Sequence, residues 1–337
     1  MRRIIELTPG QDRSIIRVIE EGRYESFHHF LTAAIDNQLM LEAATSGEPL
    51  PSSADYPGVR ASQPESAIAP EPIQLARIST VQPLASSELN GGDDAGRWLW
   101  GQINSVLAIK FACRNAAHLV SDSADMSLRQ LAESVAKAAV AFGNRLSAVD
   151  AHHKRLRGGK LATSFPTAAD KSVDRFAYQY IGAKRMDGRY DGALFQLGLL
   201  GVDSEARPRL TAAGAGFAEV NNPLMDGTTD SRGRWLSDEE EDFYLRRVAA
   251  CTPAERNPMQ WAVTSVQGGA KTRAAMNRRL SAAHSGWTEA EVETYRVGAV
   301  SRLVQLRVLR MIRNGRDIRY ELGPNAGLAF SILEIST

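Results

Sequence analysis

Residues 298–322 read GAVSRLVQLRVLRMIRNGRDIRYEL, and this stretch decides how the C-terminal part of the chain is expected to fold. Its first part has apolar residues at helical spacing, which predicts a helix over about 298–311. Asn314-Gly315 is a strong hairpin signal, and the run 318–322 is typical of a short strand. The stretch therefore predicts a helix that is followed by a β-hairpin with arginines near its tip.

A second stretch has a similar pattern of apolar and polar residues. Residues 192–200, GALFQLGLL, can be laid over 298–306, GAVSRLVQL, and each is followed by a polar turn and a short strand-like run. A helix followed by such a hairpin resembles the winged helix-turn-helix. The resemblance implies two winged-helix-like units, with DNA contact from the arginines of the second unit: Arg302, Arg307, Arg313, Arg316 and Arg319.

The first forty-five residues are patterned differently. A short strand over about 3–7 is followed by Thr8-Pro9, which is a helix-start signature. A helix over about 10–21 ends at Gly22, and Ser26 is the expected N-cap of a second, amphipathic helix. One strand and two helices are too small to close a core alone, so the segment predicts a homodimer with paired strands.

The N-terminal segment resembles the ribbon-helix-helix family (Arc/MetJ), and within it the antitoxin type. The resemblance lies in the short sequences Glu6-Leu7-Thr8-Pro9 and Gly22-Arg23-Tyr24-Glu25-Ser26. The resemblance implies that the paired ribbon enters the major groove of double-stranded DNA and that the start of helix two holds a phosphate. The DNA-binding residues implied in this module are Arg2, Arg3, Ile4, Glu6 and Ser26. The alternative is that the module serves only to dimerise the chain.

The predicted fold class is mainly α, with the chain divided into four parts. A ribbon-helix-helix module over 1–45 is followed by a flexible linker over 46–95, which is rich in proline and serine. Helical domains with one winged-helix-like unit each are expected over 96–235 and 236–337. The helices are expected at about 97–120, 126–150, 169–185, 189–200, 211–219, 237–251, 254–265, 270–284, 288–295 and 298–311.

The composition is that of a soluble globular protein, with 43% hydrophobic and 23% charged residues and a formal net charge of +1. Any affinity for nucleic acid must therefore come from locally basic surfaces. Between 267 and 320 the cations greatly outnumber the carboxylates, and most of them are arginines, which favour bidentate phosphate contact. For each arginine taken alone, the alternative is a solvated helix face.

A second basic run over 152–160, HHKRLRGGK, is expected to form a loop that follows a DNA backbone. Its predicted DNA-binding residues are Lys154, Arg155, Arg157 and Lys160.

No catalytic, cofactor or metal site is expected, because no phosphate-binding loop, nucleophile elbow or metal-ligand spacing occurs. The acidic run 238–242 is expected to open a helix, where carboxylates favour the positive end of the dipole. Cys113 and Cys251 are expected to be core thiols. The chain has no signal-peptide pattern and no apolar segment of membrane-spanning length, so a cytoplasmic location without membrane contact is expected.

The function expected from the sequence is that of a dimeric DNA-binding protein, either a transcriptional regulator or a factor of a mobile or defence element. One alternative is an antitoxin-like interaction module that holds a protein partner. Another is a plasmid replication initiator or a restriction-type specificity subunit, because tandem winged helices resemble both.

Overall fold

The computed structural model describes residues 79–89, 98–123, 125–157, 160–168, 171–226, 234–314 and 317–335. The chain divides into two compact units, 1–68 and 69–337, and all of the described residues belong to the second. The predicted ribbon-helix-helix module therefore lies outside the described residues, and with it Arg2, Arg3, Ile4, Glu6 and Ser26.

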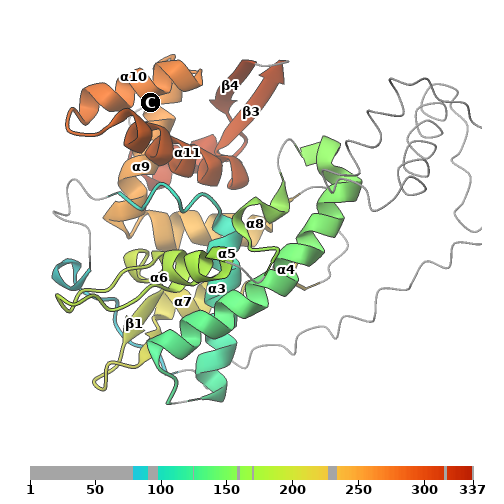
Figure 1. The fold of residues 1–337 in the computed structure, drawn as a ribbon. Coiled ribbons are helices and arrows are strands. Elements are labelled where there is room, and N and C mark those ends of the chain that lie inside the picture. The colour runs from blue at the N-terminus through green and yellow to red at the C-terminus, as the bar shows by residue number, and fades with distance from the viewer. Residues whose placement is uncertain are drawn as a thin grey trace, which may run out of the picture. The chain divides into compact units, whose positions relative to one another are not determined.

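The described part is mainly helical, as predicted (Figure 1). The helices are α3 (Val106–Asp122), α4 (Leu128–Arg157), α5 (Lys171–Phe176), α6 (Ala193–Gln196), α7 (Ala212–Glu219), α8 (Asp238–Phe243), α9 (Pro253–Gln267), α10 (Arg273–Ala283), α11 (Glu289–Gln305) and α12 (Ala326–Ile332). Single π-helical segments, Ala177–Ile181 and Tyr244–Ala249, extend α5 and α8. The strands form two antiparallel hairpins, β1 (Leu200–Val202) with β2 (Pro208–Leu210) and β3 (Leu309–Asn314) with β4 (Asp317–Leu322).

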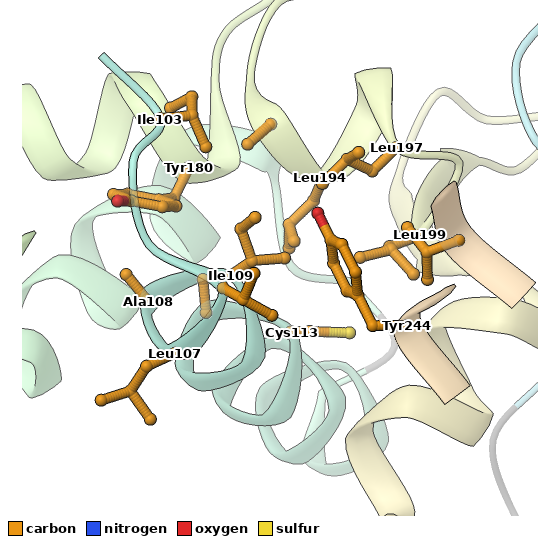
Figure 2. Close-up of a cluster of buried hydrophobic side chains, with 14 of the residues drawn as sticks. Ile103, Leu107, Ala108, Ile109, Cys113, Tyr180, Leu194, Leu197, Leu199 and Tyr244 are labelled. Atoms are coloured by element: carbon orange, nitrogen blue, oxygen red, sulfur yellow. The ribbon is translucent and has the colours of Figure 1, made fainter. Parts of the chain in front are cut away.

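Helix α3 runs through the core. Most of its residues are buried, and the two buried cations among them, Lys110 and Arg114, are each paired with a carboxylate. The hydroxyl of Ser105 caps its start by accepting a hydrogen bond from the Ala108 amide at 3.2 Å. Figure 2 shows side chains of α3 and the preceding segment packed with others from distant parts of the chain: Ile103, Leu107, Ala108, Ile109, Cys113, Tyr180, Leu194, Leu197, Leu199 and Tyr244.

Residues 79–89 lie against this core, so the flexible-linker prediction is wrong for them. The Val81 amide donates to the Leu210 carbonyl at 2.9 Å, and Leu89 is buried in the hydrophobic core. The composition of the surrounding stretch suggested a tether, but strand β2 has a free edge that the Val81 backbone completes. The predicted domain boundary at 235/236 lies inside the compact unit 69–337.

The predicted internal similarity corresponds to a repeated helix-to-strand junction, but in a different register from the predicted one. After α6, the backbone amide of Leu199 donates a hydrogen bond to the Leu194 carbonyl. After α11, the amide of Val308 donates in the same way to the Leu303 carbonyl. The residue before each donor has a positive φ, which is 64° at Gly198 and 54° at Arg307. Glycine adopts this conformation without strain, whereas arginine needs other contacts to hold it.

Two helix predictions near these junctions are corrected. The predicted helix over 189–200 is reduced to the short α6, because Gly192 before it and Gly198 after it have positive φ angles of 102° and 64°. The two helices predicted over 288–295 and 298–311 are one helix, α11, which ends at Gln305. Gly298 lies inside α11 and does not interrupt it. A Cβ at this position would lie 2.5 Å from the carbonyl oxygen of Gly101. The glycine lets α11 approach the backbone of that segment closely.

The two cysteines differ. Cys113 is buried on α3, as predicted, and burial raises the pKa of its thiol to about 12. The prediction of a core thiol is wrong for Cys251, which is exposed at the end of the π-helical segment that follows α8.

This difference predicts the thiol reactivity of the native chain, because only a thiolate that solvent can reach reacts quickly. With an aromatic disulfide reagent near pH 8, one thiol per chain is expected to react at once, and the second only after denaturant is added. Cys251→Ser should abolish the fast phase and Cys113→Ser should leave it intact. A fast phase that survives in Cys251→Ser would show that α3 is not buried as described.

Candidate nucleic-acid interface

The residues from α9 onward form a pair of helices followed by a hairpin. Helices α10 and α11 are joined by a short turn that contains Gly286, and β3 and β4 follow. Between α9 and α10 the chain pairs with the hairpin: Tyr320 donates its amide to the Lys271 carbonyl at 2.8 Å, and Thr272 forms a bridge with Arg319. The segment around Lys271 thus adds a third, very short strand beside β4.

Local sequence signals position these elements. Pro253 stands at the start of α9, where its missing amide hydrogen costs nothing. The hydroxyl of Thr272 accepts from the Ala275 amide at 3.2 Å and caps α10. Thr288 and Glu291 form a reciprocal capping box at the start of α11.

An aromatic cluster holds the turn between α10 and α11. His284 stacks on Trp287 with ring centroids 4.0 Å apart, and Trp287 stacks on Tyr295 at 4.3 Å. The ring of Trp98, from the segment before α3, meets Trp287 edge-on at 5.3 Å. These contacts tie the helix pair to a distant part of the chain, so its geometry is firmly held.

The hairpin is in the predicted place. Its register runs from Leu309 opposite Leu322 to Asn314 opposite Asp317, and Figure 1 shows it projecting from the C-terminal helices. Strand alternation puts Arg319 on the face opposite to the buried Tyr320. On the same face as Arg319, Arg310 is paired across the strands with Glu321 at 3.2 Å. Arg319 and the tip residue Arg313 are both exposed.

Arg302 is buried in the core, and its predicted role in DNA binding is corrected. Its side chain is 1% exposed. Its Nε and Nη2 donate to Oε1 and Oε2 of Glu255 at 2.7 and 2.6 Å, and the Tyr244 hydroxyl donates to the same carboxylate at 3.0 Å. Burial raises the pKa of Glu255, and the guanidinium of Arg302 opposes that shift. An arginine enclosed in this way cannot reach a phosphate.

Arg307 is held in an ion-pair network. It binds Glu241 through Nε and Nη2, with Nη2 2.6 Å from Oε2, and it also contacts Asp238. The Asn325 amide nitrogen donates to the same Glu241 carboxylate at 2.6 Å. These bonds hold Arg307 in its positive-φ conformation and neutralise its charge. The prediction that Arg307 contacts DNA is therefore corrected.

The other predicted site residues are placed as follows. Lys154, Arg155 and Arg157 belong to the end of α4, so the prediction of a loop over 152–160 is corrected for these three. The helix continues because nothing in that run breaks it before Gly158. Lys160 is exposed in the connection that follows. Arg316 lies outside the described residues.

Four exposed cations just before α10 and along it were not among the predicted contact residues: Lys271, Arg273, Arg278 and Arg279. The density of cations over 271–279 is visible in the sequence. Their relation to the hairpin is not, because it depends on the backbone pairing of Lys271 with Tyr320, across about fifty residues of chain.

The start of α11 carries the opposite charge. Glu289, Glu291 and Glu293 are exposed there. In a helix-turn-helix the second helix enters the major groove with its N-terminal residues. Glu293 is paired with Arg296, but the carboxylates of Glu289 and Glu291 at that position would be repelled by DNA phosphates. Lys271, Arg313 and Arg319, around the short sheet, are therefore better placed for a phosphate backbone than α11 is.

The described residues contain no group of three or more His, Cys, Asp or Glu side chains that could hold a metal ion. Among the same residues, no helix has the length and apolar character needed to cross a membrane. No protein-family model, curated protein or solved structure matches this chain.

Proposed function

We propose that this chain is a dimeric DNA-binding protein, acting as a transcriptional regulator or as a factor of a mobile or defence element. In this proposal the N-terminal module forms the homodimer and reads bases. The exposed cations around the β3–β4 sheet contact the phosphate backbone of double-stranded DNA.

The observation that carries the proposal is the arrangement after α9. A short strand at Lys271, the helix pair α10 and α11, and the β3–β4 hairpin follow one another, and the short strand returns to pair with β4. This order resembles a winged helix-turn-helix. The resemblance extends to the hairpin tip, where Arg313 is exposed.

The contacts of the first hairpin, β1–β2, favour a structural role for it rather than a second DNA contact. Asp203 accepts the amides of Glu205 and Arg207 at 2.9 and 3.0 Å, and it pairs with the Arg209 guanidinium at 3.0 Å. Arg207 pairs with Asp125 at 2.7 Å. The arginines of β1–β2 are thus compensated locally, unlike Arg313 and Arg319 of β3–β4.

The proposal predicts the effect of removing the sheet cations from the full chain. A triple variant, Lys271→Gln with Arg313→Gln and Arg319→Gln, should bind a random-sequence duplex on the order of 10- to 100-fold more weakly at moderate salt. The slope of log K against log salt should decrease in magnitude by roughly 3, since each lost phosphate contact removes about one unit. Fluorescence anisotropy of a labelled duplex measures both quantities.

A matched triple variant separates local contact from net charge. Arg129→Gln, Lys137→Gln and Lys171→Gln remove the same charge from exposed positions on α4 and α5. This control should bind as the wild type does. Equal losses in the two triple variants would overturn the assignment of the sheet as the contact. An absence of any binding by the wild type at low salt would favour the alternative of a module that holds a protein partner.

A further inference from the structure

A cavity of about 340 Å³ lies along α11. The sheet, the first residue of α10 and three more distant segments form its other walls. Its walls include Lys160 and Ser164 from the connection after α4, Trp235 from the segment before α8, and Arg273 at the start of α10. Volumes of about 300–1,000 Å³ are typical of sites for small molecules. The segments that meet here are far apart in the sequence, so the cavity is a product of the fold.

The charge of the cavity is positive. Lys160, Arg273 and Arg296 line it, and Glu293 is its one carboxylate. Glu293 is already compensated, because it is paired with Arg296 and accepts from the Asn277 side chain at 2.8 Å. Lys160 and Arg273 are both exposed, so their charges are available to an anion that enters the cavity.

The floor of the cavity is apolar. Val297, Val300 and Val304 of α11 present aliphatic side chains, and Met311 and Tyr320 extend this surface onto the sheet. The half-buried ring of Trp235 lies at the edge, and its backbone carbonyl accepts from the Asn222 side chain at 3.2 Å, which fixes that segment. Apolar walls with a few convergent polar groups are the usual composition of a small-molecule site.

We propose that this cavity binds a small organic anion, namely a flat apolar ring system that carries one carboxylate, sulfonate or phosphate group. The ring packs on the valine floor beside Trp235, and the anionic group lies between Lys160 and Arg273. Arginine and lysine bind such oxyanions by charge-assisted hydrogen bonds. Binding at this cavity does not depend on DNA contact, because none of the three sheet cations of the DNA-binding proposal lines it.

The test uses naphthalene-1-sulfonate and its neutral counterpart, naphthalene-1-sulfonamide, titrated calorimetrically into the full chain. The sulfonate should bind to one site per chain and more tightly than the sulfonamide. Arg273→Gln should weaken the sulfonate about tenfold, the equivalent of one charge-assisted hydrogen bond, and leave the sulfonamide unchanged. Arg278→Gln, an exposed arginine on the same helix that does not line the cavity, is the matched control and should change neither.

A second variant tests the location. Val304→Trp fills the cavity and should abolish the binding of both compounds, with an unchanged thermal midpoint showing that the chain is folded. Equal affinities for the two compounds, or a sulfonate affinity that Arg273→Gln leaves unchanged, would overturn the proposal, as would the lack of a saturable site.

Discussion

Replacing Arg302 by alanine is expected to lower the free energy of unfolding by about 3–5 kcal/mol. The substitution leaves the Glu255 carboxylate in the core without its cation, and Glu255 is completely buried. The Arg302 guanidinium also donates to the Ile103 carbonyl, which would lose that partner. Urea unfolding of the wild type and the variant, followed by far-ultraviolet circular dichroism, measures the difference.

Two controls separate the effect of breaking the Arg302–Glu255 ion pair from the effect of shortening an arginine side chain. Arg278→Ala removes an exposed arginine and should change the free energy of unfolding by no more than about 0.5 kcal/mol. Arg302→Met combined with Glu255→Leu replaces both charges by apolar groups and should recover much of the stability, since neither charge is then buried alone. A cost below about 1 kcal/mol for Arg302→Ala would mean that solvent reaches Glu255.

Replacing Lys110 by methionine is expected to cost about 3–5 kcal/mol near pH 8 and clearly less near pH 5. Lys110 Nζ lies 3.4 Å from Oε1 of Glu240, and both side chains are fully buried. Nζ also donates to the Phe217 and Val220 carbonyls, and the loss of those two bonds costs the same at every pH. The part that varies with pH comes from Glu240.

Burial is the main influence on Glu240 and raises its pKa from 4.5 to about 7, against the opposing effect of Lys110. A raised native pKa means that the folded chain binds the proton more tightly. The resulting stabilisation is therefore fully present below about pH 4.5 and is lost as the pH rises through about 7. Without Lys110 the pKa of Glu240 rises further, so in the variant the pH-dependent loss of stability should extend to higher pH.

Glu240→Gln is the control for this pH dependence. The amide resembles the protonated carboxyl, so the fall in stability between about pH 4.5 and 7 that Glu240 causes should be absent. Free energies of unfolding at several pH values between 5 and 8 give the comparison. Identical pH profiles for the wild type and Glu240→Gln would show that another group causes the slope.

Local signals predicted the local structure well. Asn314-Gly315 predicted the β3–β4 hairpin, and the acidic run 238–242 predicted the start of α8. These features depend on residues that are neighbours in the chain, so their chemistry is visible in the sequence. The bounds of α6 and α11 were less accurate, because Gly192 and Gly298 serve turns and close packing that only the fold reveals.

The burial and the partners of the charged residues could not be predicted from the sequence. Arg302 and Arg313 look alike in the sequence, yet the first is buried against Glu255 and the second is exposed. Glu255 is 47 positions away from Arg302, and no local pattern joins them. In the same way, the docking of Val81 on β2 depends on a strand edge that is formed far along the chain. Long-range pairing thus decided which cations remain available to a ligand.

The most direct test of DNA binding by the helical unit is the salt dependence of its affinity for a random duplex. Residues 69–337 form one compact unit and include the docked segment 79–89, so a fragment with these bounds is the form to measure beside the full chain. Between about 50 and 200 mM salt, the fragment should retain a slope of log K against log salt of roughly −3 or steeper. A slope near zero, or a complete loss of binding in the fragment, would contradict DNA contact by this unit.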